Sequence, residues 1–117
     1  MHIDKDLIAA SATPLVLAIL SEGESYGYAI LKRVRALSAG DLEWTDGMLY
    51  PLLHRLSRLG YVTTEWRTPP EVRRRKYYAL TDEGRAALAE QQRQWLAVTR
   101  ALNDVWPGAV LTAAGEA

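Results

Sequence analysis

Four consecutive basic residues, Arg73, Arg74, Arg75 and Lys76, form the segment of this sequence best suited to bind an anion. Guanidinium and ammonium groups donate charge-assisted hydrogen bonds to phosphate oxygens. Because alternate residues of a strand face opposite sides of a sheet, we expect Arg73 and Arg75 to point one way and Arg74 and Lys76 the other. One pair can then contact phosphates. A second interpretation stays open, in which these charges only prevent an edge strand from pairing with another chain.

A second group of polar side chains lies on a helix expected from Thr45 or Asp46 to about Gly60. At 3.6 residues per turn, one side of this helix carries only leucines, namely Leu49, Leu52, Leu53, Leu56 and Leu59. The opposite side carries Gly47, Tyr50, Pro51, His54 and Arg58, with Arg55 on the flank. Such side chains can reach base edges and phosphates. The alternative is a polar face that is merely solvated.

The charge distribution favours a nucleic-acid partner although the net charge is zero. Between residues 55 and 76 there are seven Lys and Arg residues against two Glu residues, while most acidic residues lie toward the two ends. A local basic patch is sufficient to hold phosphates. The length of 117 residues, with 49% hydrophobic and 24% charged residues, fits one globular domain.

Several other classes of protein are disfavoured. There is no Cys, so neither a disulfide nor a thiolate metal site is expected. The two histidines are His2 and His54, and His54 has no carboxylate within reach along its helix, so we expect no enzyme activity, no metal and no cofactor. No apolar run approaches the roughly 20 residues of a membrane span, and the N-terminus lacks the pattern of a signal peptide. The sequence therefore predicts a cytoplasmic protein without a membrane partner.

The remaining elements are predicted from periodicity and from turn residues. A short helix is expected at residues 4–11, and a buried helix begins at Thr13-Pro14 and continues through residues 15–20. Ser25 is expected to cap a helix over residues 26–37, whose apolar stripe includes Tyr28. Two strands, 61–66 and 73–80, flank the break at Pro69-Pro70, and a brief third strand is possible at residues 41–44.

This order predicts a mainly α fold, a winged helix-turn-helix with a long C-terminal dimerisation helix. The DNA-binding part spans residues 1–80, the dimerisation helix residues 81–106, and a flexible tail residues 107–117. In the last helix, Leu88, Trp95 and Leu102 are seven residues apart, and Gln91, Val98 and Val105 follow a second heptad position. A helix of this length reaches ~35 Å, more than a small domain covers, so a second copy is the expected partner.

Trp95 lies on this seam and has two interpretations. Two copies near a twofold axis could hold a flat aromatic effector, or the indole could simply pack in the dimer interface. Trp44, Trp66 and Trp106 are expected in the core, in wing packing and in docking of the tail, respectively.

The motifs Gly27-Tyr28-Ala29-Ile30, residues 47–56, Gly60-Tyr61-Val62 and residues 74–84 together resemble the PadR family of bacterial transcriptional regulators, over about residues 15–88. The resemblance implies a homodimeric winged-helix repressor, often with an effector that releases it from DNA. It implies that Thr45, Tyr50, His54 and Arg58 reach the DNA groove and that Arg74 and Arg75 reach the backbone. The sequence looks like the short-tailed type, whose single C-terminal helix joins the N-terminal helix in the dimer, here through Leu7 and Ile8.

The sequence thus predicts a homodimeric DNA-binding regulator, a repressor relieved by a small-molecule effector. The alternative from another class is a winged-helix module that binds protein and has no DNA operator.

Overall fold

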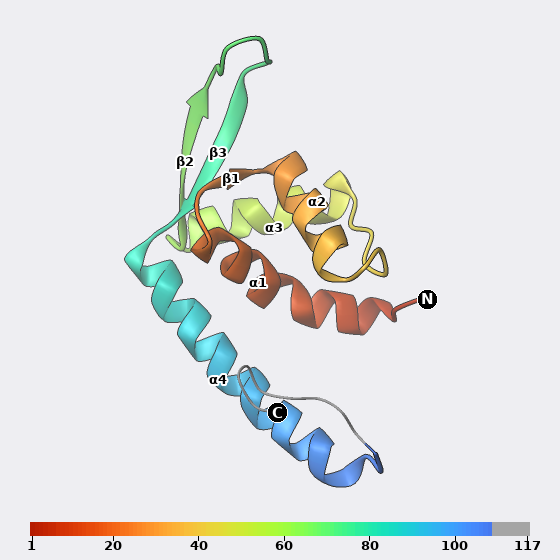
Figure 1. The fold of residues 1–117 in the computed structure, drawn as a ribbon. Coiled ribbons are helices and arrows are strands. Elements are labelled where there is room, and N and C mark those ends of the chain that lie inside the picture. The colour runs from red at the N-terminus through yellow and green to blue at the C-terminus, as the bar shows by residue number, and fades with distance from the viewer. Residues whose placement is uncertain (109–117) are drawn as a thin grey trace.

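The computed structural model describes residues 1–108 and has the winged-helix architecture predicted from the sequence (Figure 1). Its elements, in chain order, are α1 (Lys5–Ser21), β1 (Ser25–Tyr26), α2 (Gly27–Leu37), α3 (Asp46–Arg58), β2 (Val62–Arg67), β3 (Arg75–Leu80) and α4 (Asp82–Val105). The β2–β3 hairpin, the wing, projects from one side of the first three helices, and α4 leaves its base in the opposite direction (Figure 1). The tail expected at residues 107–117 lies, from residue 109 onward, outside the described residues.

The N-terminal part of the chain forms one continuous helix, so the prediction of two separate helices was wrong. Asp4 caps α1 by accepting a hydrogen bond from the Asp6 backbone N–H at 3.0 Å. Pro14 lies inside the helix and does not start it. A proline there removes one backbone donor, but the helix continues because Ala12 and Val16, on either side of it, are both buried in the core.

Helix α3 follows its predicted pattern closely. The Thr45 hydroxyl caps it by accepting a hydrogen bond from the Met48 backbone N–H at 3.3 Å. The four leucines at positions 49, 52, 53 and 56 are buried. Leu59 is exposed because the helix has already ended there, with Leu59 as its C-cap. The polar side of α3 is thereby fixed facing away from the core.

The sheet has the order β1–β3–β2, and all its pairs are antiparallel. Its third strand is β1, in which Ser25 pairs with Tyr78 and Tyr26 with Tyr77. The suggestion of a strand at residues 41–44 was wrong, and so was the role of Ser25 as a helix cap. Tyr26 occupies the cap position of α2 without a side-chain hydrogen bond. The 41–44 segment instead follows a turn in which the Leu42 N–H bonds the Ser38 hydroxyl at 2.8 Å, and it buries Trp44 in the core, as predicted for that indole.

One core joins α1, α2, α3, the sheet and the first turns of α4. Gly84, in the first turn of α4, is essential to this joint, since a β-carbon there would overlap the backbone carbonyl of Tyr61. Leu88 is buried one turn later. Helix α4 has 24 residues and is ~36 Å long at the usual rise, so its second half extends beyond the core (Figure 1). Within residues 1–108, no helix combines the length and hydropathy that crossing a bilayer would require.

Candidate nucleic-acid interface

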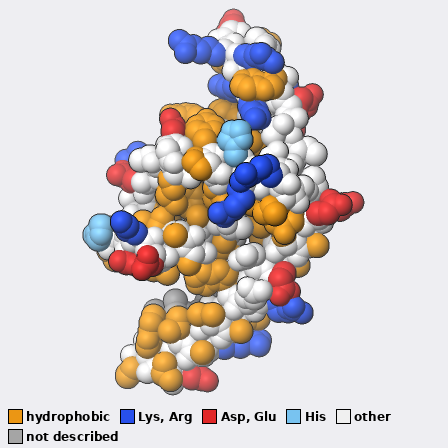
Figure 2. Space-filling view, turned by 180° about the vertical axis from the view of Figure 1, so that it is seen from behind, with side chains coloured by type: hydrophobic (Ala, Val, Ile, Leu, Met, Phe, Trp, Pro, Cys, Tyr) orange, Lys and Arg blue, Asp and Glu red, His pale blue; other side chains and the backbone are white. Residues whose placement is uncertain are grey.

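A groove of about 830 Å³ lies between α3, the start of α2 and the wing. Tyr50 and His54 line it from α3, and the four consecutive cations line it from the wing. The structure therefore brings together six of the predicted DNA-binding residues: Tyr50, His54, Arg73, Arg74, Arg75 and Lys76. Lys and Arg side chains gather on the wing in the upper part of Figure 2. In the part of the chain that the structure describes, none of the four cations forms an ion pair with a carboxylate.

Two of these cations lie against aromatic rings on the groove side of the wing. The Arg74 guanidinium lies 4.6 Å from the centre of the Trp66 ring. The Lys76 ammonium lies 5.9 Å from the same ring and 5.7 Å from the ring of Tyr78. Arg75 also lines the groove, but its guanidinium stacks on Tyr26, at 4.2 Å from the ring centre, and not on Trp66. The predicted alternation thus separates Arg75 from Arg74 and Lys76, and the rings hold the charges in place without neutralising them.

Tyr50 is set in the groove by its contact with α2. The Tyr50 hydroxyl lies so close to Gly27 that a β-carbon at that position would overlap it. Tyr50 nevertheless remains 40% exposed. Tyr78 lies buried beneath, and burial, followed by the neighbouring Tyr50, raises the pKa of its hydroxyl. The Tyr78 phenol therefore stays protonated at neutral pH.

The other four predicted DNA-binding residues lie outside this groove. Thr45 and Arg58 are at the two ends of α3, with Thr45 acting as the cap and Arg58 exposed. Pro51 and Arg55 face α1, where they line a separate trough between α1 and α3. The Arg55 guanidinium donates a hydrogen bond to the Thr13 hydroxyl at 3.1 Å. The helical wheel placed these two residues near the polar face, but it could not show that α1 runs alongside them.

Two exposed aromatic residues of the groove were missed by sequence reasoning. Trp66 was expected to pack within the wing, yet it is 53% exposed and lines the groove. Tyr28 was expected in the apolar stripe of the second helix, yet it is 64% exposed and also lines the groove. A usable signal existed for Trp66, because the hairpin register places it opposite Lys76. No comparable signal marks Tyr28, the second residue of α2, which begins at Gly27.

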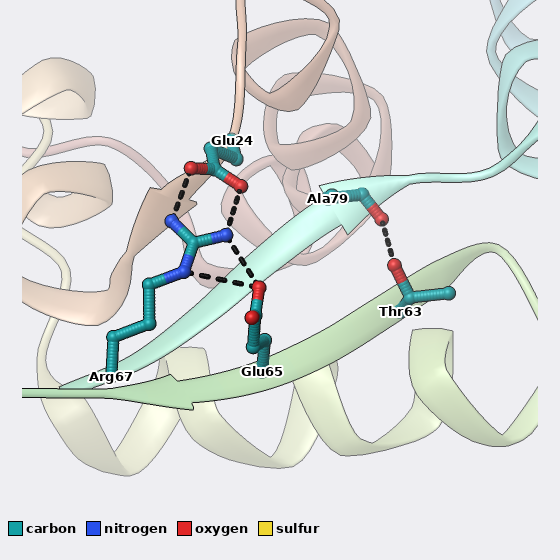
Figure 3. Close-up of polar contacts among 5 residues, drawn as sticks. All are labelled: Glu24, Thr63, Glu65, Arg67 and Ala79. Atoms are coloured by element: carbon teal, nitrogen blue, oxygen red, sulfur yellow. Dashed lines mark hydrogen bonds and ion pairs between the residues drawn. The ribbon is translucent and has the colours of Figure 1, made fainter.

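The opposite side of the wing carries a closed ionic cluster (Figure 3). The two terminal nitrogens of Arg67 donate to the two carboxylate oxygens of Glu24, one of them at 2.9 Å, and its Nε donates to Glu65 at 3.0 Å. These hydrogen bonds lower the pKa of Glu24 and raise that of Arg67. Arg67 also lies 4.6 Å from the ring of Tyr77, which meets Tyr26 edge to face. We call this set (Glu24, Tyr26, Glu65, Arg67 and Tyr77) the wing brace, since it links the turn before β1 to β2 and β3.

The predicted dimer residues divide along α4. Leu88 is buried in the chain's own core, so it has little surface left for a partner. Gln91, Trp95 and Leu102 are half-buried, whereas Val98 and Val105 are 50% and 70% exposed. On α1, Leu7 is exposed and Ile8 half-buried. Hydrophobic side chains gather at the far end of α4 in the lower part of Figure 2. Trp106, expected to dock the tail, is half exposed at the end of α4.

Trp95 lines a small apolar cavity of about 280 Å³ between α1 and α4. Pro14, Leu15, Ala18 and Leu88 contribute most of its apolar wall. The cavity is open on one side, and its residues come from the two helices that the resemblance places in a dimer interface. Among the described residues, no group of three or more His, Cys, Asp or Glu side chains is placed to hold a metal ion.

Comparison with known proteins agrees with this geometry. Residues 16–90 match the family model described as the transcriptional regulator PadR-like family. A transcriptional regulator from Clostridium thermocellum superposes with a TM-score of 0.80 at 27% identity, covering 88% of this chain and all of the other. A PadR-like regulator from Bacillus cereus gives a TM-score of 0.75 at 25% identity, covering 86% and 96% of the two chains. The Escherichia coli transcriptional regulator YqjI is 31% identical over 80 residues, which are 68% of this chain and 37% of YqjI.

Proposed function

The chain belongs to the PadR-like family of transcriptional regulators and is a DNA-binding regulator, and from this premise we propose that it is a homodimeric repressor released from its operator by a small molecule. The observation that carries the proposal is the groove between α3 and the wing, with Tyr50 and His54 on one wall and, on the other, four cations that pair with no carboxylate of residues 1–108. A protein of zero net charge that places four consecutive cations along one groove is suited to a polyanion there.

In this proposal α3 enters the major groove and the wing follows the phosphate backbone. Tyr50 and His54 can donate to or accept from base edges, because both project from the polar side of α3. Arg74 and Lys76 contact phosphates and supply affinity through counterion release. Thr45 and Arg58, at the two ends of α3, contact the backbone on either side of the bases that are read.

The dimer is proposed to form through α4 with support from α1. Val98 and Val105 present apolar surface on the half of α4 that extends beyond the core, and Leu7 does the same on α1. A second copy is the simplest cover for these side chains. The two α3 helices would then contact half-sites about one turn of DNA apart, roughly 34 Å.

The effector is proposed to act by changing the spacing of the two reading helices. A planar aromatic molecule stacked on Trp95 would lie between α1 and α4, where the dimer forms. The effector would change the affinity for DNA by binding one arrangement of the dimer more tightly than the other. The proposed setting is the cytoplasm, where the operator DNA is, and the proposal includes neither catalysis nor a cofactor.

The test begins with selection of bound fragments from the source genome, followed by footprinting and a titration of the selected operator. We expect two protein chains per site, a footprint with two half-sites, and a steep loss of affinity with added salt. In a reporter assay, placing the operator over a promoter should lower transcription. A protein that selects no fragment above background, but binds a protein partner with little dependence on salt, would instead be a winged-helix interaction module.

A further inference from the structure

The trough between α1 and α3 is separate from both the DNA groove and the Trp95 cavity. It measures about 480 Å³ and is lined by apolar side chains from the two helices: Ile8, Ala9 and Ala12 from α1, and Met48, Pro51 and Leu52 from α3. Its two charged lining residues are both cations, Lys5 and Arg55. Small-molecule sites commonly have this size and this composition, an apolar lining with a few polar groups that fix orientation.

The two cations lie toward opposite ends of the trough. Lys5 is the first residue of α1, whereas Arg55 donates to Thr13, eight residues later and therefore about 12 Å along the helix axis. The hydrogen bond to Thr13 uses only one terminal nitrogen of Arg55, Nη2, at 3.1 Å. In residues 1–108 neither Lys5 nor Arg55 forms an ion pair with a carboxylate. A positioned guanidinium beside an apolar surface is the arrangement that binds a carboxylate through two hydrogen bonds.

We propose that this trough binds a small carboxylic acid with an apolar body, whose carboxylate pairs with Arg55 and whose body lies along Ala9, Ala12 and Pro51. Charge complementarity selects the acid, because the lining offers two cations and no anion. The regulatory meaning of the site rests on the proposed function. A molecule held between α1, a dimer helix in that proposal, and α3, the reading helix, would change the angle at which α3 is presented to DNA.

The test measures binding of 2-naphthoate to the full chain by calorimetry in the absence of DNA, with 2-naphthylmethanol as the uncharged analogue. We expect saturable binding of the acid, and at least tenfold weaker binding of the alcohol. Arg55→Met, which keeps an apolar stem and removes the charge, should lower affinity for the acid at least tenfold and abolish the preference for acid over alcohol. Since DNA is absent, failure here leaves the operator titration of the proposed function unaffected.

Two matched variants locate the binding site. Ala9→Phe fills the trough and should weaken acid binding at least tenfold, whereas Ala10→Phe, at the next exposed position of the same helix and outside the trough, should not. Circular dichroism and melting temperature check that both variants fold. Equal binding of acid and alcohol, no saturable binding of either, or wild-type binding by Ala9→Phe would overturn the proposal. So would loss of acid binding in Trp95→Ala with retention in Ala9→Phe, or weaker self-association of Ala9→Phe in sedimentation, which would assign the trough to a second copy.

Discussion

The two sides of the wing use the same residue types for opposite purposes. On the brace side, Arg67 is hydrogen-bonded to Glu24 and Glu65, so its charge is neutralised where it stands. On the groove side, Arg74 and Lys76 lie on Trp66 with no carboxylate partner among the described residues. Aromatic rings orient a cation but leave its charge available to a ligand. The side of a hairpin that is suited to an anion can therefore be identified from the partners of its arginines. Counting the arginines on each side would not distinguish the two sides.

The register of the hairpin explains why the brace needs its carboxylates. Arg67 lies directly opposite Arg75 in the β2–β3 pairing. Like charges at such positions are destabilising. Glu24 and Glu65 compensate Arg67, while Arg75 turns onto the ring of Tyr26. On the brace side, repulsion between Arg67 and Arg75 is thus relieved by side chains of the same chain. On the groove side, the positive charges of Arg74 and Lys76 are available for a bound phosphate to neutralise.

The strongest test of this difference between the two sides of the wing is to remove the two groove-side charges. We expect the double variant Arg74→Ala, Lys76→Ala to bind the selected operator about 100-fold more weakly, since each lost hydrogen bond between charged groups costs roughly 1.5 kcal/mol or more. The slope of log affinity against log salt should become shallower by about two. Fluorescence anisotropy at several salt concentrations measures both quantities. Arg93→Ala, Arg100→Ala removes equal charge from α4, and an equal loss of affinity there would mean that total charge decides binding.

A second prediction concerns how Tyr50 is held in the groove. Gly27→Ala places a β-carbon against the Tyr50 hydroxyl and should displace the ring. We expect about tenfold weaker DNA binding with a nearly unchanged melting temperature, because the atom that must move is the end of a side chain. The Tyr50→Ala background is the control, since Gly27→Ala should have no further effect there. Additive losses would show that Gly27 acts on DNA binding by another route.

Much of this architecture could be predicted from the sequence because it depends on local periodicity. The leucine face of α3, its Thr45 cap and the alternation within the cationic strand all follow from spacing along one element. The failures involve partners that are distant in sequence. A two-residue strand such as β1 carries almost no pattern, and its pairing with Tyr77 and Tyr78 depends on where the chain returns.

In the candidate site, too, features set by nearby residues were predicted and features set by distant partners were not. The six predicted residues from α3 and the wing line one groove, since helix and hairpin are close in sequence, and their contact with DNA stays a prediction. Pro51 and Arg55 were assigned to the DNA face, yet they line the trough beside α1, more than 40 residues earlier in the chain. Whether they also contact DNA stays a prediction. Pro14 shows that a local signal can also fail. The Thr13-Pro14 pair predicted a helix start, but the helix continues through Pro14 because residues on both sides of it are buried.

A third prediction separates the charge of the two groove cations from the orientation that the Trp66 ring gives them. Trp66→Ala removes the ring under Arg74 and Lys76 while keeping both charges. We expect about fivefold weaker operator binding, in line with the roughly 1 kcal/mol of an exposed cation–π contact, and an unchanged salt slope. Trp66→Phe should restore most of the affinity because it also offers an aromatic face. If the phenylalanine variant bound no better than the alanine variant, the indole would be contributing something other than a surface for the cations.

The smallest effect is expected on the brace side, where it should appear in stability more than in DNA binding. Arg67→Gln should change operator affinity by less than twofold and leave the salt slope as it is, since Arg67 is already paired. Arg67 lowers the pKa of Glu24, so the stability that this contact contributes is present above the ordinary glutamate pKa of about 4.3 and is lost as the pH falls through the lowered value. Melting temperatures of the wild type and the variant should therefore differ at pH 7 and converge toward pH 3. A loss of DNA affinity as large as that of the groove double variant would mean that the brace also sets the position of the wing on DNA, and the two sides of the hairpin would then share one function.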